Sequence, residues 1–118
     1  MSRDASLFLE DIAQAAEKID RSVSQLSFDA FCANDVVFDA VLFNLQVIGE
    51  AAKKLPDSVK AAMPEVEWSD AARFRDIIAH HYFALDAQIV WDVVRNRIPE
   101  IHAAARALLA RLDEEGNT

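Results

Sequence analysis

Hydrophobic residues recur at helical spacing along the first part of the chain. Between Asp4 and Leu26 an apolar residue follows every third or fourth position, with charged residues between. This is the pattern of an amphipathic helix with one buried face. Ser27 is a suitable N-cap for a short helical turn after it.

The segment from Asn34 to Leu55 is apolar around nearly its whole circumference. Asn34 or Asp35 can cap this predicted helix, and Pro56 ends it. A helix that is apolar all round is buried on several sides. Because a domain of 118 residues rarely encloses one helix by itself, we expect part of this surface to face a second copy of the chain.

A third long helix is predicted to lead into a group of polar side chains. Ser69 or Asp70 can cap it, and it continues to about His80. Before it, a brief helix is predicted to begin at Pro56 and to end at Pro64, and residues 64–68 are predicted to form a connection.

The last predicted helix begins at Asp86 and carries a long apolar stripe. Pro99 lies within this stripe and should kink or split the helix, because proline lacks a backbone donor and clashes with the preceding turn. The polar tail, residues 113–118, is expected to fray. Together the patterns predict one all-α domain over residues 1–118, an antiparallel bundle of four to five helices.

Charge and composition narrow the function. Twenty acidic against 12 basic residues give a net charge of −8, which disfavours non-specific binding to nucleic acid. Arg73, Arg75, Arg95 and Arg97 could still line a local basic cleft, or could be solvated partners of the acidic residues. Cys32 is the single cysteine, so an internal disulfide and a multi-cysteine zinc site are excluded. No apolar run is long enough to cross a membrane and the start lacks a signal-peptide pattern, so a cytoplasmic protein is expected.

The densest chemistry lies between Arg75 and Tyr82. Arg75 could bind a phosphate bidentately, and His80 could exchange a proton near neutral pH. Tyr82 could position a phosphate or be modified. Alternatively, Arg75 and Asp76 are surface charges, while His80, His81 and Tyr82 cover a helix end. An ideal helix rotates Arg75 and His80 apart by roughly 140°.

Other polar residues give weaker indications. A metal site built from His80, His81 and Asp86 is disfavoured because adjacent histidines rarely bind one ion, so no metal or cofactor is expected. His102 is expected to be solvated, and Cys32 is expected to be a small buried side chain.

The order and spacing of several segments carry a family resemblance. They are Asn44–Lys53, Pro64–Trp68, Arg75–Phe83, Ile89–Trp91 and Pro99. The chain resembles HEPN domains of the HepT type, whose signature R-x4-H-x-Y corresponds to Arg75, His80 and Tyr82. The likeness covers most of the chain.

The resemblance implies a homodimeric, metal-independent endoribonuclease whose two motifs meet across the dimer interface. Arg75 and His80 would be the catalytic pair, with Asp76 and His81 in support. Asp76 takes a position that is often Asn in the family. Cleavage would proceed by attack of the RNA 2′-hydroxyl on the adjacent phosphate. Basic side chains lining the cleft with Arg75 would then bind RNA, and the candidates are Arg73 and Arg95.

The resemblance also implies a bacterial toxin–antitoxin pair. The antitoxin would be a small nucleotidyltransferase that neutralises the toxin by transferring AMP to Tyr82. The alternative is a helical dimer without catalysis, whose Arg–His cluster binds a nucleotide or serves the antitoxin as a docking site.

Overall fold

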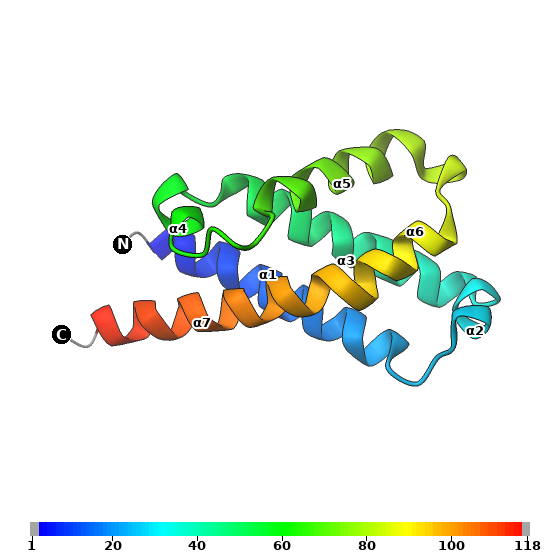
Figure 1. The fold of residues 1–118 in the computed structure, drawn as a ribbon, viewed down its shortest axis with the longest axis horizontal. Coiled ribbons are helices and arrows are strands. Elements are labelled where there is room, and N and C mark those ends of the chain that lie inside the picture. The colour runs from blue at the N-terminus through cyan, green and yellow to red at the C-terminus, as the bar shows by residue number, and fades with distance from the viewer. Residues whose placement is uncertain (1–2, 117–118) are drawn as a thin grey trace.

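The computed structural model describes residues 3–116, which fold into an antiparallel bundle of helices (Figure 1). The four long helices run alternately along the bundle and are α1 (Arg3–Val23), α3 (Asp35–Lys54), α5 (Trp68–His81) and α7 (Ile98–Gly116). Shorter helices lie between them: α2 (Phe28–Cys32), α4 (Asp57–Ala61) and α6 (Ala87–Asp92). The predicted all-α bundle is therefore confirmed, with three short helices added to the four long ones in the described part of the chain.

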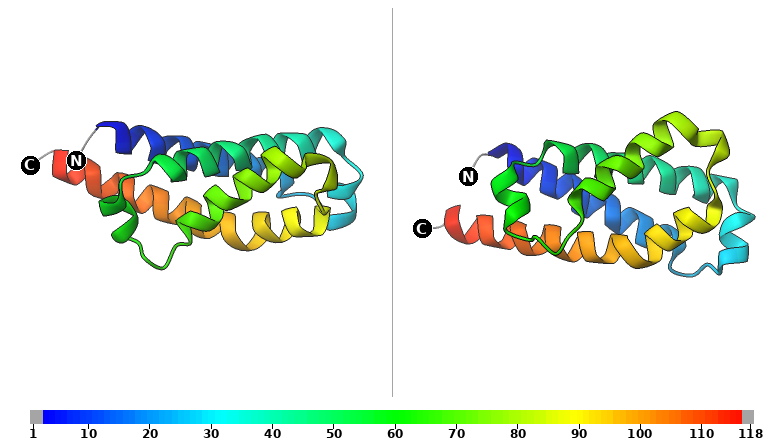
Figure 2. Two further views of the ribbon diagram at one scale, coloured as in Figure 1. Left: turned by 90° about the horizontal axis from the view of Figure 1, so that it is seen from above. Right: turned by 45° about the horizontal axis from the view of Figure 1, so that its top comes forward.

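α3 lies at the centre of the arrangement. It packs against α1 and against α5, while α7 packs against α1. α1 begins and α7 ends at the same end of the bundle, and α2 and the loop after α5 lie at the other end (Figures 1 and 2). No helix in the described range is long and apolar enough to cross a membrane.

Three of the predicted caps are confirmed. The Ser27 hydroxyl accepts a hydrogen bond from the backbone N–H of Ala30 at 3.1 Å, and the Asn34 side chain accepts one from Val37 at 3.0 Å. Asp86 accepts one from the N–H of Gln88 at 2.8 Å. Each bond satisfies a donor that the first helical turn leaves without an intrahelical partner.

The predicted start of α5 was wrong. The helix begins at Trp68, and its N-cap is Glu67, which makes no capping hydrogen bond through its side chain. Ser69 and Asp70 therefore lie inside the first turn. Trp68 is buried, and its indole N–H donates to the Met63 carbonyl at 3.3 Å. Burial of this large aromatic side chain, rather than a polar cap, fixes the start of the helix.

Pro99 interrupts the last helix as expected. The residues before it, Val93–Arg97, form a π-helix, and the N–H of Ile98 bonds the carbonyl of Val93 five residues back. This wider turn accommodates a proline that cannot donate to the preceding turn. Val94 and Ile98 on either side remain buried.

Two helix ends differ from their predicted positions. α1 ends at Val23, three residues before Leu26, whose N–H bonds the Val23 carbonyl in a turn. The tail was expected to fray from Asp113, but α7 continues as a helix to Gly116. Residues 117–118 lie outside the described part of the chain.

The core is closed by aliphatic side chains from α1, α3 and α7 and by one aromatic cluster. Phe31 is fully buried, with its ring centroid 5.6 Å from that of Phe38 and 5.0 Å from that of Trp91. Cys32 beside it is exposed, contrary to expectation, because the five-residue α2 turns only Phe31 inward. Asn44 is the buried polar residue of α3, and its amide donates to the Ala40 carbonyl of the same helix at 2.9 Å.

A charged cluster joins α1 to α7. His102 Nε2 lies 2.8 Å from Glu17 Oε2, and Arg106 donates to the same oxygen at 2.7 Å. The hydrogen bond with His102, and then that with Arg106, lowers the pKa of Glu17. The prediction of a solvated His102 was therefore wrong, because the partner lies 85 residues away on another helix.

Candidate active site

α5 carries the Arg75–Tyr82 motif and is held closely against α3. Gly49 permits this approach. A Cβ atom built on Gly49 would lie 2.3 Å from the Cβ of Arg75 and 2.6 Å from the carbonyl oxygen of Ala71. Any side chain at this position would therefore push α3 and α5 apart. Ile78, one turn further along α5, is buried in the core.

The guanidinium of Arg75 is held between two carboxylates. Its Nε lies 3.2 Å from Glu50 Oε2 on α3, and its Nη1 donates to Asp76 Oδ1 at 3.1 Å. The Arg75 side chain remains 33% exposed. Arg75 also lines a hollow of about 320 Å³ beside α1 and α3, together with Lys54.

Tyr82 is also tied to α3. It opens a short 3-10 helix, η1 (Tyr82–Ala84), and its hydroxyl donates to Asp39. This hydrogen bond, with smaller effects from burial and from the charges of Asp39 and Asp35, raises the pKa of Tyr82.

The contacts of Arg75 with Glu50 and of Tyr82 with Asp39 lie on the same side of α3. Asp39 and Glu50 are eleven residues apart, which is close to three full helical turns, so both carboxylates lie on the same side of α3. Arg75 on α5 contacts Glu50, and Tyr82 at the start of η1 contacts Asp39. These two motif residues therefore face the same edge of α3.

His80 points away from this edge. It is five residues from Arg75 but seven from Arg73, so it shares a side of α5 with Arg73. His80 and His81 are exposed, and within residues 3–116 neither imidazole makes a hydrogen bond or an ion pair. Helical periodicity therefore places Arg75 and His80 on different sides of α5.

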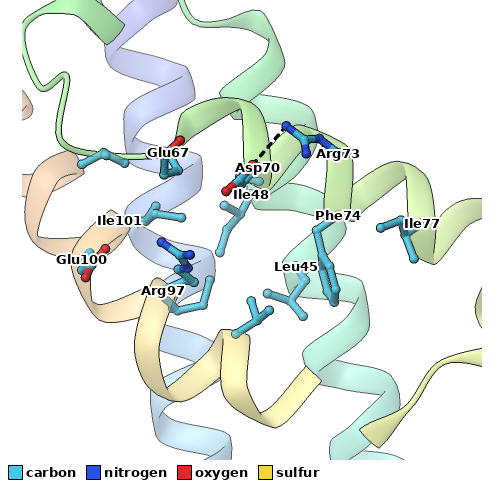
Figure 3. A pocket seen from close by; sticks show the side chains of 14 residues that line it. Leu45, Ile48, Glu67, Asp70, Arg73, Phe74, Ile77, Arg97, Glu100 and Ile101 are labelled. Atoms are coloured by element: carbon cyan, nitrogen blue, oxygen red, sulfur yellow. Dashed lines mark ion pairs between the residues drawn. The ribbon is translucent and has the colours of Figure 1, made fainter. Parts of the chain in front are cut away.

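The other arginines lie in separate places. Arg73 pairs with Asp70 at 3.1 Å and, with Arg97, borders a hollow of about 290 Å³ between α5, the π-helix and α7. Figure 3 shows Leu45, Ile48 and Phe74 turned into this hollow and Arg73 at its rim.

Arg95 lies over the Trp91 ring, 5.4 Å from its centroid, and borders a third hollow beside Glu17 and His102. Within one chain, Arg73, Arg75 and Arg95 therefore line three different hollows, and the structure of a single copy does not gather them in one cleft.

Large apolar side chains near the motif remain uncovered. Phe83 is 100% exposed, Val36 is 79% exposed and Phe43 is 64% exposed. Phe43 lies on α3 between Asp39 and Glu50, on the edge that holds Tyr82 and Arg75. Exposed apolar residues that gather beside a polar site are typical of an interaction surface.

Sequence reasoning missed the contributions of α3 to the motif. Asp39 contacts Tyr82 and Glu50 contacts Arg75, from 43 and 25 positions away in the sequence. A usable signal was the eleven-residue spacing of Asp39 and Glu50, which interrupt the mostly apolar stretch of α3 before its terminal lysines. In the described part of the chain, no three His, Cys, Asp or Glu side chains gather in a way that could hold a metal ion.

The fold is an all-helical bundle that carries an Arg–His–Tyr motif at the end of α5 and the start of η1, and comparison with known proteins identifies the family. The model of the family "Ribonuclease HepT-like" matches residues 12–108. The chain therefore belongs to the HepT-like ribonuclease family, and the resemblance inferred from the motif is confirmed.

Individual relatives of this chain also carry ribonuclease names. A protein of Thermococcus cleftensis named "Probable ribonuclease HepT" is 37% identical over 101 residues, which cover 86% of this chain and 92% of the relative. One of Methanocaldococcus jannaschii named "Putative RNase MJ0127" is 38% identical over 97 residues, 82% of this chain and 80% of the relative.

A longer protein of the same organism, "Gamma-glutamylcyclotransferase and putative RNase MJ0434", is 29% identical over 117 residues, 99% of this chain but 53% of that protein. No solved structure matches the chain.

Proposed function

We propose that this protein is a metal-independent endoribonuclease that works as a homodimer, and that it is the toxin of a bacterial toxin–antitoxin pair. The observation that carries the proposal is the motif geometry in a chain of the HepT-like ribonuclease family. Arg75 lies at the edge of α3, while His80 lies on another side of α5. A second copy would supply the missing half of each site.

The exposed apolar residues support the dimer. Val36, Phe43 and Phe83 lie next to the motif and would lose contact with water if two copies met there. Buried against a partner, this surface would bring two motifs into one cleft. Lower solvent access would also strengthen the attraction of Arg75 for a phosphate.

The reaction would use one group that moves a proton twice and one group that binds the phosphate. The RNA 2′-oxygen forms a bond to the adjacent phosphorus, and the bond to the 5′-oxygen breaks. His80 takes the proton of the 2′-hydroxyl and returns it to the departing 5′-oxygen. Arg75 donates to the non-bridging oxygens, where charge grows in the transition state. The products would be a 2′,3′-cyclic phosphate and a 5′-hydroxyl.

Tyr82 would be the site of control by a nucleotidyltransferase antitoxin. Tyr82 is 39% exposed, and its hydroxyl donates to the carboxylate of Asp39, which is also exposed. Transfer of AMP from ATP to the Tyr82 oxygen would release pyrophosphate and the phenolic proton, and a charged phosphodiester would replace the hydrogen bond to Asp39. The bulky anion would occupy the cleft beside His80 and repel RNA.

Cleavage of RNA in the presence of EDTA tests the catalytic proposal. Wild-type protein, whose intact mass shows an unmodified Tyr82, is compared with Arg75→Ala and His80→Ala. His102→Ala is the matched histidine control far from the motif. We expect cleavage with 2′,3′-cyclic ends by wild type and by the control only. Absence of cleavage by unmodified wild type would instead favour the non-catalytic interaction module.

Sedimentation measurements test the dimer independently. Phe43→Asp places a charge in the proposed interface and should yield monomers with an intact helical spectrum. Leu7→Asp is the control, because Leu7 is 53% exposed on α1. A dimer that survives Phe43→Asp but not Leu7→Asp would place the interface elsewhere.

A further inference from the structure

The ion pair between Glu50 and Arg75 connects the motif to a helix that contributes none of its residues. Arg75 Nε lies 3.2 Å from Glu50 Oε2, and Glu50 Oε1 lies 3.7 Å from the ammonium nitrogen of Lys54. Glu50 is therefore held from two sides. We infer that Glu50 is a positioning residue that orients the Arg75 guanidinium for the phosphate, an inference that rests on the proposed ribonuclease function.

The close approach of α3 and α5 at Gly49 brings Glu50 and Arg75 within contact distance. Because Gly49 has no side chain, the Cβ of Arg75 lies directly against α3. The next residue on α3 is Glu50, so its carboxylate meets the guanidinium of a side chain whose base is already fixed. This arrangement reduces the rotamers open to Arg75, a long side chain that would otherwise move freely at a half-exposed position.

The two carboxylates also select which guanidinium donors remain available. Glu50 lies beside Nε, and Asp76 accepts from Nη1. Arg has five donors in a planar fork, so Nη2 and the second hydrogen of Nη1 remain for a ligand. A fixed fork can donate two parallel hydrogen bonds to one phosphate.

Holding the guanidinium with a carboxylate has an electrostatic cost. The negative charge of Glu50 weakens the attraction between Arg75 and an incoming phosphate. Both side chains are partly exposed, at 33% and 42%, so solvent screens the pair. Positioning and repulsion therefore predict different kinetic results when Glu50 is changed.

Steady-state kinetics on a defined RNA separate these effects. Glu50→Ala should lower kcat by about 10- to 100-fold, as expected when a catalytic group loses its orientation, without raising KM. Glu50→Gln should retain part of the rate, because its amide oxygen can still lie beside Nε. Glu65→Gln, the control, removes one exposed carboxylate elsewhere. An unchanged kcat with a lower KM in Glu50→Ala would overturn the inference.

A double-mutant comparison tests whether Glu50 acts through Arg75. In an Arg75→Lys background, Glu50→Ala should have much less effect on kcat than in wild type, because the group that it orients is gone. Equal effects in both backgrounds would show that Glu50 does not act through the guanidinium, which would refute its positioning role.

NMR supplies a readout that does not depend on cleavage. The Nε–Hε signal of Arg75, assigned by its loss in Arg75→Lys, should be sharp in wild type and in Glu65→Gln. It should broaden or disappear in Glu50→Ala while the backbone amide signals stay dispersed. If wild type fails to cut RNA but this difference is seen, the ribonuclease proposal fails and the ordering of Arg75 stands. If the Arg75 signal is the same in Glu50→Ala as in wild type, the inference fails whether or not RNA is cut.

Discussion

Replacing Gly49 with alanine measures how tightly α3 and α5 must fit. The added methyl would lie 2.3 Å from Arg75 Cβ and 2.6 Å from the Ala71 carbonyl oxygen, so at least one backbone must move. Overpacking of this kind lowers the free energy of unfolding by about 1–3 kcal/mol. Because the clash involves a backbone atom, we expect a loss near the upper end, about 3 kcal/mol. Against this, alanine stabilises a helix interior by about 1 kcal/mol relative to glycine. The net loss is about 2 kcal/mol.

This loss converts into a measurable change in melting temperature. An unfolding entropy of roughly 2.1 cal/mol/K per residue gives about 0.25 kcal/mol/K for this chain, so Tm should fall by about 8 °C. Thermal unfolding followed by circular dichroism measures it. The pair Lys53→Gly and Lys53→Ala, at an exposed position of α3, calibrates the propensity term. A Gly49→Ala protein that melts at or above the wild-type temperature would refute the close-contact argument.

Three further results are expected. Phe31→Ala should cost about 3–5 kcal/mol in urea unfolding, since the ring is fully buried among aromatic neighbours. Tyr82 is the only tyrosine, so an ultraviolet titration reports its ionisation alone: the pKa should lie above 10 in wild type and move toward 10 in Asp39→Asn. Because the pKa of Tyr82 is raised in the folded state, the stabilisation from its hydrogen bond is fully present below pH 10, the ordinary tyrosine value. It is lost as the pH rises through the raised pKa of the folded protein. Glu17→Gln should lower Tm at pH 7, and the difference from wild type should vanish as the pH falls below 4.5 and through the lowered pKa of Glu17.

Local sequence signals predicted most of the fold. Ser27, Asn34 and Asp86 cap helices as expected, because a capping bond joins residues two or three apart and depends on little else. Pro99 predicted the interruption of the last helix for the same reason. The start of α5 at Trp68 did not follow from local rules, since burial of the indole outweighed the polar residues after it.

The sequence motif proposes which residues form the candidate site but says little of their geometry. It singles out Arg75, His80 and Tyr82, whose roles stay a prediction, and helical periodicity indicates that Arg75 and His80 diverge. The partners of these residues could not be found this way, because Glu50 and Asp39 reach them across two packed helices. The hydrogen bond between Glu17 and His102 was not predicted for the same reason, because it joins two packed helices.

The common position of the two chain ends has a consequence for fusion proteins. α1 begins and α7 ends at one end of a bundle about 50 Å long, and the loop that carries Tyr82 lies at the other end. A reporter or affinity domain joined at either end of the chain would start at the end of the bundle opposite Tyr82. The same geometry would let one longer polypeptide carry this fold beside another domain without covering Tyr82. Labels for imaging or capture can therefore be attached at either end when modification of Tyr82 is to be measured.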